Sequence, residues 1–143
     1  MLLRTLLTIA AIIFATLGPV RAGGIGDADR SAIQEIIAGQ ITAFGADDGG
    51  KAYGYASPTI QLIFPNSEAF MAMVRQGYPQ VYRPQRYGFG RIEEGATGMP
   101  AQHVIIVGPD GKTYEAVYTM QRQPDGSWKI NGCTMALLSG VNA

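Results

Sequence analysis

The sequence contains few of the residue types on which catalytic and metal sites depend. Its 143 residues include one cysteine, one histidine and one tryptophan. A single histidine excludes zinc sites built from several histidines and cysteines, and the Gly-x-Ser-x-Gly motif of serine hydrolases does not occur. A lone cysteine cannot form an internal disulfide, so we expect Cys133 to be a small buried hydrophobe in the last strand. The alternative is a reactive thiol or an intermolecular bridge.

The chain also lacks an excess of charge of either sign, because 11 Lys and Arg residues balance 11 Asp and Glu residues. Such a surface offers no basic field to nucleic acid or to anionic lipid. Gly88-Phe89-Gly90 lacks the third glycine of a dinucleotide fingerprint, and no acidic segment has the calcium-loop pattern. We therefore expect no nucleic-acid partner, no cofactor and no metal.

Long apolar runs are absent except near the beginning of the chain. Residues 5–17 carry no charge, follow Arg4, and precede a Gly-Pro break and small-residue spacing that ends at Ala22. The run is shorter than the about twenty residues of a membrane span, and the pattern is typical of a secretory signal peptide. We therefore predict that 1–22 is removed. The remainder, 23–143, is expected to be one domain, periplasmic or secreted, without a stable membrane anchor.

Hydrophobic periodicity predicts a helical first half and a β-rich second half. Ile33, Ile37 and Ile41 recur at helical spacing, whereas alternation dominates the second half. Asp27 or Ser31 is expected to cap the first helix. The expected helices cover 29–44, 51–56 and 66–77, and the expected strands cover 59–64, 86–94, 102–107, 113–122 and 127–138.

Two Pro-Asp-Gly turns join the last three strands into an antiparallel meander. Setting Gly108 opposite Thr113 at the first turn brings His103 opposite Tyr118 on one apolar face. This pairing keeps the apolar side chains of both strands together.

At the second turn, setting Gln123 opposite Ser127 places Gly132 opposite Tyr118. The same register directs Trp128 and Ile130 toward the helices, so we predict that both are core residues.

The outer face of this sheet is predicted to carry Val104, Ile106 and Val117 among polar residues. Because Val104 is then opposite Val117, the three side chains form one small apolar patch. We predict that this patch supports a weak homodimer.

Three segments carry a family resemblance: "DDGGKAYGYASPTIQLIF", "FMAMVRQGYPQVYRP" and "YTMQRQPDGSWKINGC". They resemble a bacterial exported family, domain of unknown function 4864, within the nuclear transport factor two-like superfamily that ketosteroid isomerase typifies. The resemblance covers about 33–135. It implies an α+β fold in which N-terminal helices pack on one face of a curved antiparallel sheet to form a cone. It implies no functional residues, because no activity is attached to the family.

Asp47 and Asp48 precede the short helix expected after the first one. Carboxylates at this position accept hydrogen bonds from free N–H groups and suit the helix dipole. A metal site would need further ligands that converge on the same point. We therefore interpret these two acids as caps of a corner.

His103 and Tyr118 are the main candidates for chemistry, since a histidine beside a phenol is a pair that acid–base catalysis could use. Glu115 becomes a candidate base if the register differs by one residue. Tyr87 is a further candidate ligand contact, because it alternates with arginines that could hold an anionic ligand. The alternatives are a histidine at a strand start that bonds to the backbone and a plain arginine-bearing surface.

The leading hypothesis for function is a non-enzymatic module that binds a small apolar or amphipathic ligand in the cone or binds a periplasmic protein. The alternative is a cofactor-free isomerase or dehydratase of the ketosteroid-isomerase kind that uses His103 and Tyr118, which rests on fold analogy. A purely structural interaction protein is the third hypothesis. An open cavity would favour a ligand or an enzyme, and a filled core would favour interaction.

The signal-peptide pattern predicts a mature protein that begins at Gly23. N-terminal sequencing of the protein from the periplasmic fraction should read Gly-Gly-Ile-Gly. A membrane-bound product that retains Met1 would contradict this prediction.

Overall fold

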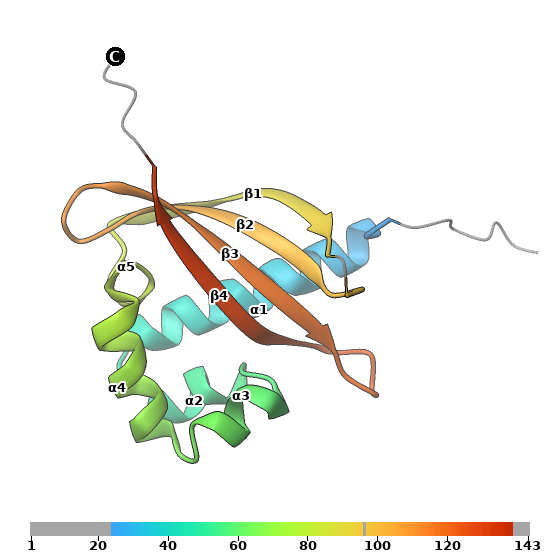
Figure 1. The fold of residues 1–143 in the computed structure, drawn as a ribbon, viewed down its shortest axis with the longest axis horizontal. Coiled ribbons are helices and arrows are strands. Elements are labelled where there is room, and N and C mark those ends of the chain that lie inside the picture. The colour runs from blue at the N-terminus through green and yellow to red at the C-terminus, as the bar shows by residue number, and fades with distance from the viewer. Residues whose placement is uncertain (1–23, 96, 139–143) are drawn as a thin grey trace, which may run out of the picture.

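The computed structural model describes residues 24–95 and 97–138 (Figure 1). The predicted signal peptide, 1–22, lies outside these residues. In the described part of the chain five helices precede four strands. The elements are α1 (Asp27–Gly45), α2 (Gly49–Gly54), α3 (Pro58–Ile63), α4 (Ser67–Gly77), α5 (Pro79–Tyr82), β1 (Arg86–Glu94), β2 (Pro100–Val107), β3 (Thr113–Arg122) and β4 (Trp128–Leu137).

The four strands form one antiparallel sheet in the order β1-β2-β3-β4. α1 runs across one face of this sheet, and α2 to α5 lie beside it on the same side (Figure 1). The described chain places no helix on the opposite face (Figure 1). Helices packed against one side of an antiparallel sheet make an α+β fold, as predicted.

α1 follows from the apolar stripe in its sequence. Ile33 and Ile37 are fully buried against the sheet and the other helices. The expected caps, Asp27 and Ser31, are wrong, because the helix begins after Gly26 without a side-chain cap and both residues lie inside it. In the first turn the carboxylate of Asp27 still interacts favourably with the helix dipole.

The segment 59–64, predicted as a strand, instead belongs to the helix α3. Ser57 Oγ accepts a hydrogen bond from Ile60 N at 3.2 Å, and Pro58 occupies the first helical turn. Proline suits this position because its missing N–H group would have no partner there. The Ser-Pro pair therefore starts a helix, and the preceding helix α2 has already ended at Gly54.

The register between β2 and β3 differs from the predicted one by one residue. Val107, and not Gly108, lies opposite Thr113. The predicted pairing requires a four-residue loop, whereas Gly108 N donates to Lys112 O at 2.9 Å and closes a loop of three residues. The glycine of each Pro-Asp-Gly turn has a positive φ, +77° and +87°. This is the geometry of a three-residue hairpin whose last residue is left-handed.

A slip of one residue exchanges the two faces of a strand. Tyr118 therefore lies opposite Gln102, and His103 lies opposite Val117. The predicted pair of His103 and Tyr118 is wrong.

The predicted outer patch is wrong for the same reason. Val104 and Ile106 are fully buried in the core beneath the helices, and only Val117 lies on the outer face. A homodimer stays a prediction, but the outer apolar patch on which it was based does not exist, because Val104 and Ile106 are buried.

β3 and β4 pair as predicted near their turn, where Met120 lies opposite Ile130. A bulge then shifts the register, so that Tyr118 lies opposite Cys133 and not opposite the predicted Gly132. Cys133 is in the last strand as predicted, but it is half-buried. It shares the inner face of the sheet with Tyr118.

β4 is an edge strand, and the junction between α2 and α3 covers part of that edge. Ser57 N donates to Ile130 O at 2.8 Å, and Ile130 N donates to Tyr55 O at 2.9 Å. These bonds form a parallel bridge between Ala56 and Ile130. The helical corner is thereby attached to the sheet through the backbone.

Trp128 and Ile130 are buried as predicted, each with 6% of its surface exposed. Trp128 Nε1 donates to Asp29 Oδ1 at 3.4 Å, which joins β4 to the start of α1. The Arg122 guanidinium lies 4.5 Å from the centre of the indole ring and covers its outer side.

Trp128→Ala should destabilise the fold by about 3 to 5 kcal/mol, the usual cost of emptying an aromatic core site. Urea denaturation of wild type and variant measures this loss. Ile105→Ala is the matched control, because Ile105 is 37% exposed on the other face and its truncation should cost much less. A loss below about 1 kcal/mol for Trp128→Ala would contradict the core assignment.

Candidate functional site

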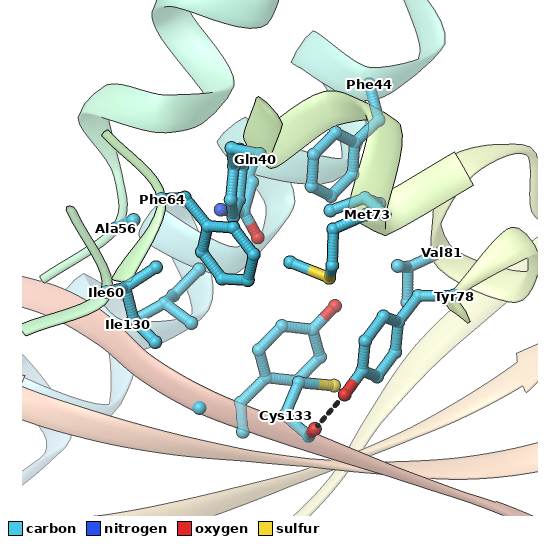
Figure 2. A pocket seen from close by; sticks show the side chains of 14 residues that line it. Gln40, Phe44, Ala56, Ile60, Phe64, Met73, Tyr78, Val81, Ile130 and Cys133 are labelled. Carbon is cyan, nitrogen blue, oxygen red and sulfur yellow. Dashed lines mark hydrogen bonds between the residues drawn. The ribbon is translucent and has the colours of Figure 1, made fainter. Parts of the chain in front are cut away.

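A cavity of about 230 Å³ lies between the helices and the inner face of the sheet. In Figure 2, Phe44, Phe64 and Met73 approach it from the helices, and Cys133 approaches it from the sheet. Most of its walls are apolar and come from α1, α3, α4 and β4. The main apolar lining residues are Phe44, Ile60, Phe64, Phe70, Val74 and Ile130.

An aromatic cluster builds the helical wall of the cavity. The ring centre of Phe70 lies 6.1 Å from those of Phe44 and Phe64 and 5.6 Å from that of Tyr53. These tilted contacts are favourable in themselves. The Tyr53 hydroxyl also donates to the carbonyl oxygen of Phe64. Because the rings pack on one another, they join α1, α2 and α4 without filling the space above the sheet.

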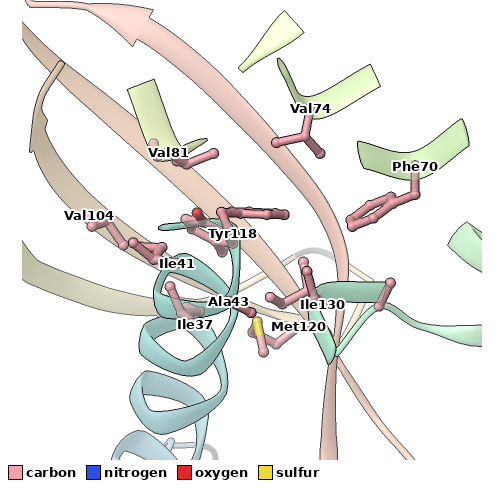
Figure 3. Close-up of a cluster of buried hydrophobic side chains, with 14 of the residues drawn as sticks. Ile37, Ile41, Ala43, Phe70, Val74, Val81, Val104, Tyr118, Met120 and Ile130 are labelled. Atoms are coloured by element: carbon pink, nitrogen blue, oxygen red, sulfur yellow. The ribbon is translucent and has the colours of Figure 1, made fainter. Parts of the chain in front are cut away.

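Four polar side chains line this space: Gln40, Tyr78, Tyr118 and Cys133. The Tyr78 hydroxyl donates to Cys133 O at 3.1 Å, and Gln40 Nε2 donates to Ala52 O at 3.2 Å. The Tyr118 hydroxyl is buried and has no oxygen or nitrogen partner among the described residues, and the weakly accepting Cys133 thiol is its neighbour. Figure 3 shows Tyr118 within the cluster of buried side chains, surrounded by side chains from the helices and from the sheet.

Burial decides the protonation of the two titratable groups in the cavity. It raises the pKa of the Tyr118 hydroxyl well above its ordinary value, with a smaller contribution from the neighbouring Cys133. Burial also raises the pKa of Cys133 to about 12. The phenol is therefore a neutral hydrogen-bond donor. The thiol is not the thiolate that a reactive cysteine requires.

His103 lies on the outer face of the sheet, away from the cavity. Its Nε2 atom is 2.6 Å from Glu93 Oε1 on β1. Its Nδ1 atom is 3.2 Å from Glu115 Oε1 on β3, but the two atoms are not aligned for a hydrogen bond. Glu115, the other candidate base, therefore also lies on the outer face. The sheet separates both residues from Tyr118.

The outer cluster is an ordinary polar contact between three strands. The ring of His103 is only 5% exposed because its neighbours on β1 and β3 cover it. The hydrogen bond with His103 lowers the pKa of Glu93, and the charge of Arg91 adds to this effect. The imidazole thus joins β1 to β2 on the face that no described helix covers.

Tyr87, the third candidate, lies on the inner face of β1 but does not line the cavity. Its ring packs edge-on against Phe89 with centres 5.9 Å apart. The arginines around it do not converge, since Arg83 pairs with Asp47 at 3.0 Å while Arg86 is exposed. Of the three candidates, only Tyr118 belongs to the cavity.

Comparison with known families matches residues 26–143 to the family described as a domain of unknown function, DUF4864. The chain belongs to this family. No curated protein and no solved structure matches it. Membership of the nuclear transport factor two-like superfamily stays a prediction.

Gln40 is a cavity residue of this DUF4864 domain that sequence reasoning missed. It lies three residues after Ile37 and one before Ile41, on the apolar stripe of α1, and is 4% exposed. A polar residue inside an apolar helical stripe is the signal that could have identified it.

The described part of the DUF4864 domain offers neither a cluster of metal ligands nor a membrane-spanning helix. Within residues 24–95 and 97–138, no group of three or more His, Cys, Asp and Glu side chains could hold a metal ion. In the same residues, no helix has the length and apolar character that crossing a membrane requires.

Asp47 and Asp48 form the corner between α1 and α2. Asp47 has a φ of 54°, its N–H donates to Phe44 O at 3.0 Å, and Asp48 N donates to Ala43 O at 2.9 Å. This pair of bonds is a Schellman motif that ends α1. Asp48 Oδ1 accepts from Lys51 N at 3.1 Å, which confirms the predicted cap of α2.

The Asp47 carboxylate also attaches the end of α5 to this corner. Arg83 Nη2 donates to both of its oxygens at 3.0 Å, and the Tyr82 hydroxyl donates to one of them. Arg83 Nη1 donates to Phe44 O at 2.6 Å. The hydrogen bond from Tyr82 and the pairing with Arg83 lower the pKa of Asp47 below its usual 3.8. Asp47 therefore has a structural role at the corner between α1 and α2, which agrees with the interpretation from the sequence.

Asp47→Asn should make the DUF4864 domain less stable at neutral pH, and the difference from wild type should shrink as the pH falls. The pKa of Asp47 is lowered in the folded state, so its ionised form stabilises the fold above the ordinary value of 3.8. That stabilisation is lost as the pH falls through the folded-state pKa. Urea denaturation at neutral and at acidic pH measures both differences.

Asn tolerates the left-handed conformation, so this variant tests the charge and not the backbone. Asp48→Asn is the control, because Asn caps a helix as well as Asp does. An Asp47→Asn deficit that stays constant down to acid pH would contradict the assignment.

Proposed function

We propose that this domain binds a small, largely apolar molecule in the cavity between its helices and its sheet, without transforming it. The observation that carries the proposal is a mainly apolar cavity of about 230 Å³ whose wall includes a buried hydroxyl without an oxygen or nitrogen partner among the described residues. A concave apolar site with a few converging polar groups is the usual form of a small-molecule site.

The cavity is a poor place for water. Its volume would hold about eight water molecules at the volume that each occupies in the liquid, yet its walls are mainly the side chains of Phe, Ile and Val. Each buried water needs two to four polar partners. An apolar molecule satisfies these walls better than water does.

The isomerase or dehydratase alternative is less well supported. A general base must lie within hydrogen-bond reach of the proton that it removes. Among the described residues that line the cavity there is no carboxylate and no imidazole. His103 and Glu115 lie on the other face of the sheet. Tyr118 alone could polarise a bound group, which favours binding over proton transfer.

α3 is the part of the wall that offers the easiest route of entry. None of its residues is fully buried, although Ile60 lines the cavity and Phe64 lies at the end of the helix. Leu62 and Ile63 point outward and are 86% and 62% exposed. A short helix with few buried contacts opens at little cost in free energy.

The second candidate function is binding of a protein partner, which the exposure of Leu62 and Ile63 favours. Export to the periplasm remains part of the proposal, on the strength of the N-terminal sequence pattern. Both candidates are compatible with that location.

Cys133→Leu should weaken binding of an apolar probe such as naphthalene, because the larger side chain occupies part of the cavity. The matched control is Thr134→Leu, which adds the same side chain to the exposed neighbour on the same strand. Equilibrium dialysis with naphthalene gives the dissociation constants. Thermal melts establish that each variant is folded.

We expect binding to wild type and to Thr134→Leu, and weaker binding to Cys133→Leu. Absence of naphthalene binding to folded wild type would contradict the proposal. Equal affinity of both variants would place the bound probe outside the cavity.

A further inference from the structure

We infer that the cavity is selective for a neutral molecule with one hydroxyl group, which hydrogen-bonds to both Tyr118 and Gln40. This inference rests on the proposed function and specifies the class of ligand. Of the four polar side chains in the wall, Tyr78 already donates its hydroxyl proton in a hydrogen bond to Cys133 O. Tyr118 and Gln40 offer the cavity one donor and one acceptor.

The donor is the Tyr118 hydroxyl. It is buried and makes no hydrogen bond to an oxygen or nitrogen atom within the described part of the chain; its neighbour, the Cys133 thiol, is only a weak acceptor. Nearly all buried polar groups in folded proteins are paired. An acceptor atom on a ligand in the cavity that Tyr118 lines could pair with this hydroxyl without a rearrangement of the fold. Met73 projects from α4 into the same space (Figure 2). A flexible thioether chain can move aside to admit that acceptor.

The acceptor is the side-chain oxygen of Gln40. Gln40 Nε2 donates to Ala52 O at 3.2 Å, and a carbonyl oxygen can bond only the amide nitrogen, so this contact fixes which end of the side chain faces the cavity. Figure 2 shows the oxygen end turned toward the middle of the cavity. This oxygen can accept a hydrogen bond from a ligand.

A hydroxyl group fits this pair of partners. Its oxygen accepts the hydrogen bond from Tyr118, and its O–H group donates a hydrogen bond to the side-chain oxygen of Gln40. An ether or a ketone could satisfy Tyr118 alone, and a plain hydrocarbon could satisfy neither residue.

The charge of the ligand follows from its surroundings. Among the lining residues that the structure describes, none is charged, and burial keeps both Tyr118 and Cys133 protonated by raising the pKa of each. An anion or a cation would lose its hydration without gaining a counter-charge. Neutral molecules avoid that cost.

The cavity volume guides the choice of a probe molecule. A dry cavity of about 150 Å³ holds one benzene molecule, and the cavity here has about 230 Å³. A two-ring hydrocarbon frame is therefore a suitable probe. Naphthalene, naphthol, methoxynaphthalene and naphthoate share that frame and differ in one group.

The test compares the four probes by equilibrium dialysis against wild type, Tyr118→Phe and Tyr114→Phe. Tyr114 is the matched control, because its hydroxyl donates to Asp110 Oδ2 at 2.6 Å and lies outside the cavity. Removing an unpaired buried hydroxyl costs the fold little, so Tyr118→Phe should melt close to wild type.

We expect Tyr118→Phe to weaken naphthol binding about fivefold, the value of one net hydrogen bond, and to leave naphthalene binding unchanged. Tyr114→Phe should change neither affinity. For wild type, methoxynaphthalene should bind about fivefold more weakly than naphthol because it has no proton for Gln40. Naphthoate should bind most weakly.

The outcomes separate this inference from the proposed function. If wild type binds naphthalene but Tyr118→Phe binds naphthol as well as wild type does, the inference is overturned and the proposed function stands. Methoxynaphthalene binding as tightly as naphthol would overturn the assignment of a hydroxyl group. If naphthoate binds more tightly than naphthol, the inference that the ligand is neutral is overturned. If no probe binds to folded wild type, both fail.

Discussion

The left-handed glycine in each Pro-Asp-Gly turn is the constraint on which the rest of the structure depends. Each glycine closes a loop of three residues. At the first turn, which contains Gly111, the length of the loop decides which residue of β2 lies opposite which residue of β3. With this length, Val104 points into the core, His103 points outward, and Tyr118 reaches the cavity. One more residue in the loop would exchange both faces of β2, so the chemistry of each face depends on backbone geometry several residues away.

Much of the fold could be predicted because its signals are local. The bounds of β1 and β3 agree with the alternation in the sequence, and α1 agrees with its stripe of isoleucines. α3 could not be predicted in the same way, since six residues give too little periodicity to separate a helix from a strand. The deciding signal there is Ser57 followed by Pro58, which also fits the end of the preceding helix.

Less of the candidate site could be predicted, because it depends on pairing between distant segments. The sequence indicates Tyr118 as a ligand contact, and Tyr118 does line the cavity. The sequence predicts His103 beside it only through a register that is wrong by one residue. Cys133 comes opposite Tyr118 through a bulge, which alternation of side chains cannot reveal. Gln40 joins them through the packing of α1, and only its place in an apolar stripe hints at it.

The bridge between the α2–α3 corner and β4 has a consequence for solubility. An open strand edge is a template on which another chain can add a strand. Tyr55 and Ser57 occupy the backbone groups of Ile130 on this edge, and the Tyr78 hydroxyl occupies the carbonyl group of Cys133. The same corner that walls the cavity thus protects the sheet from aggregation. Any motion that opened it widely would expose a strand, which sets an upper limit on how far this wall can move.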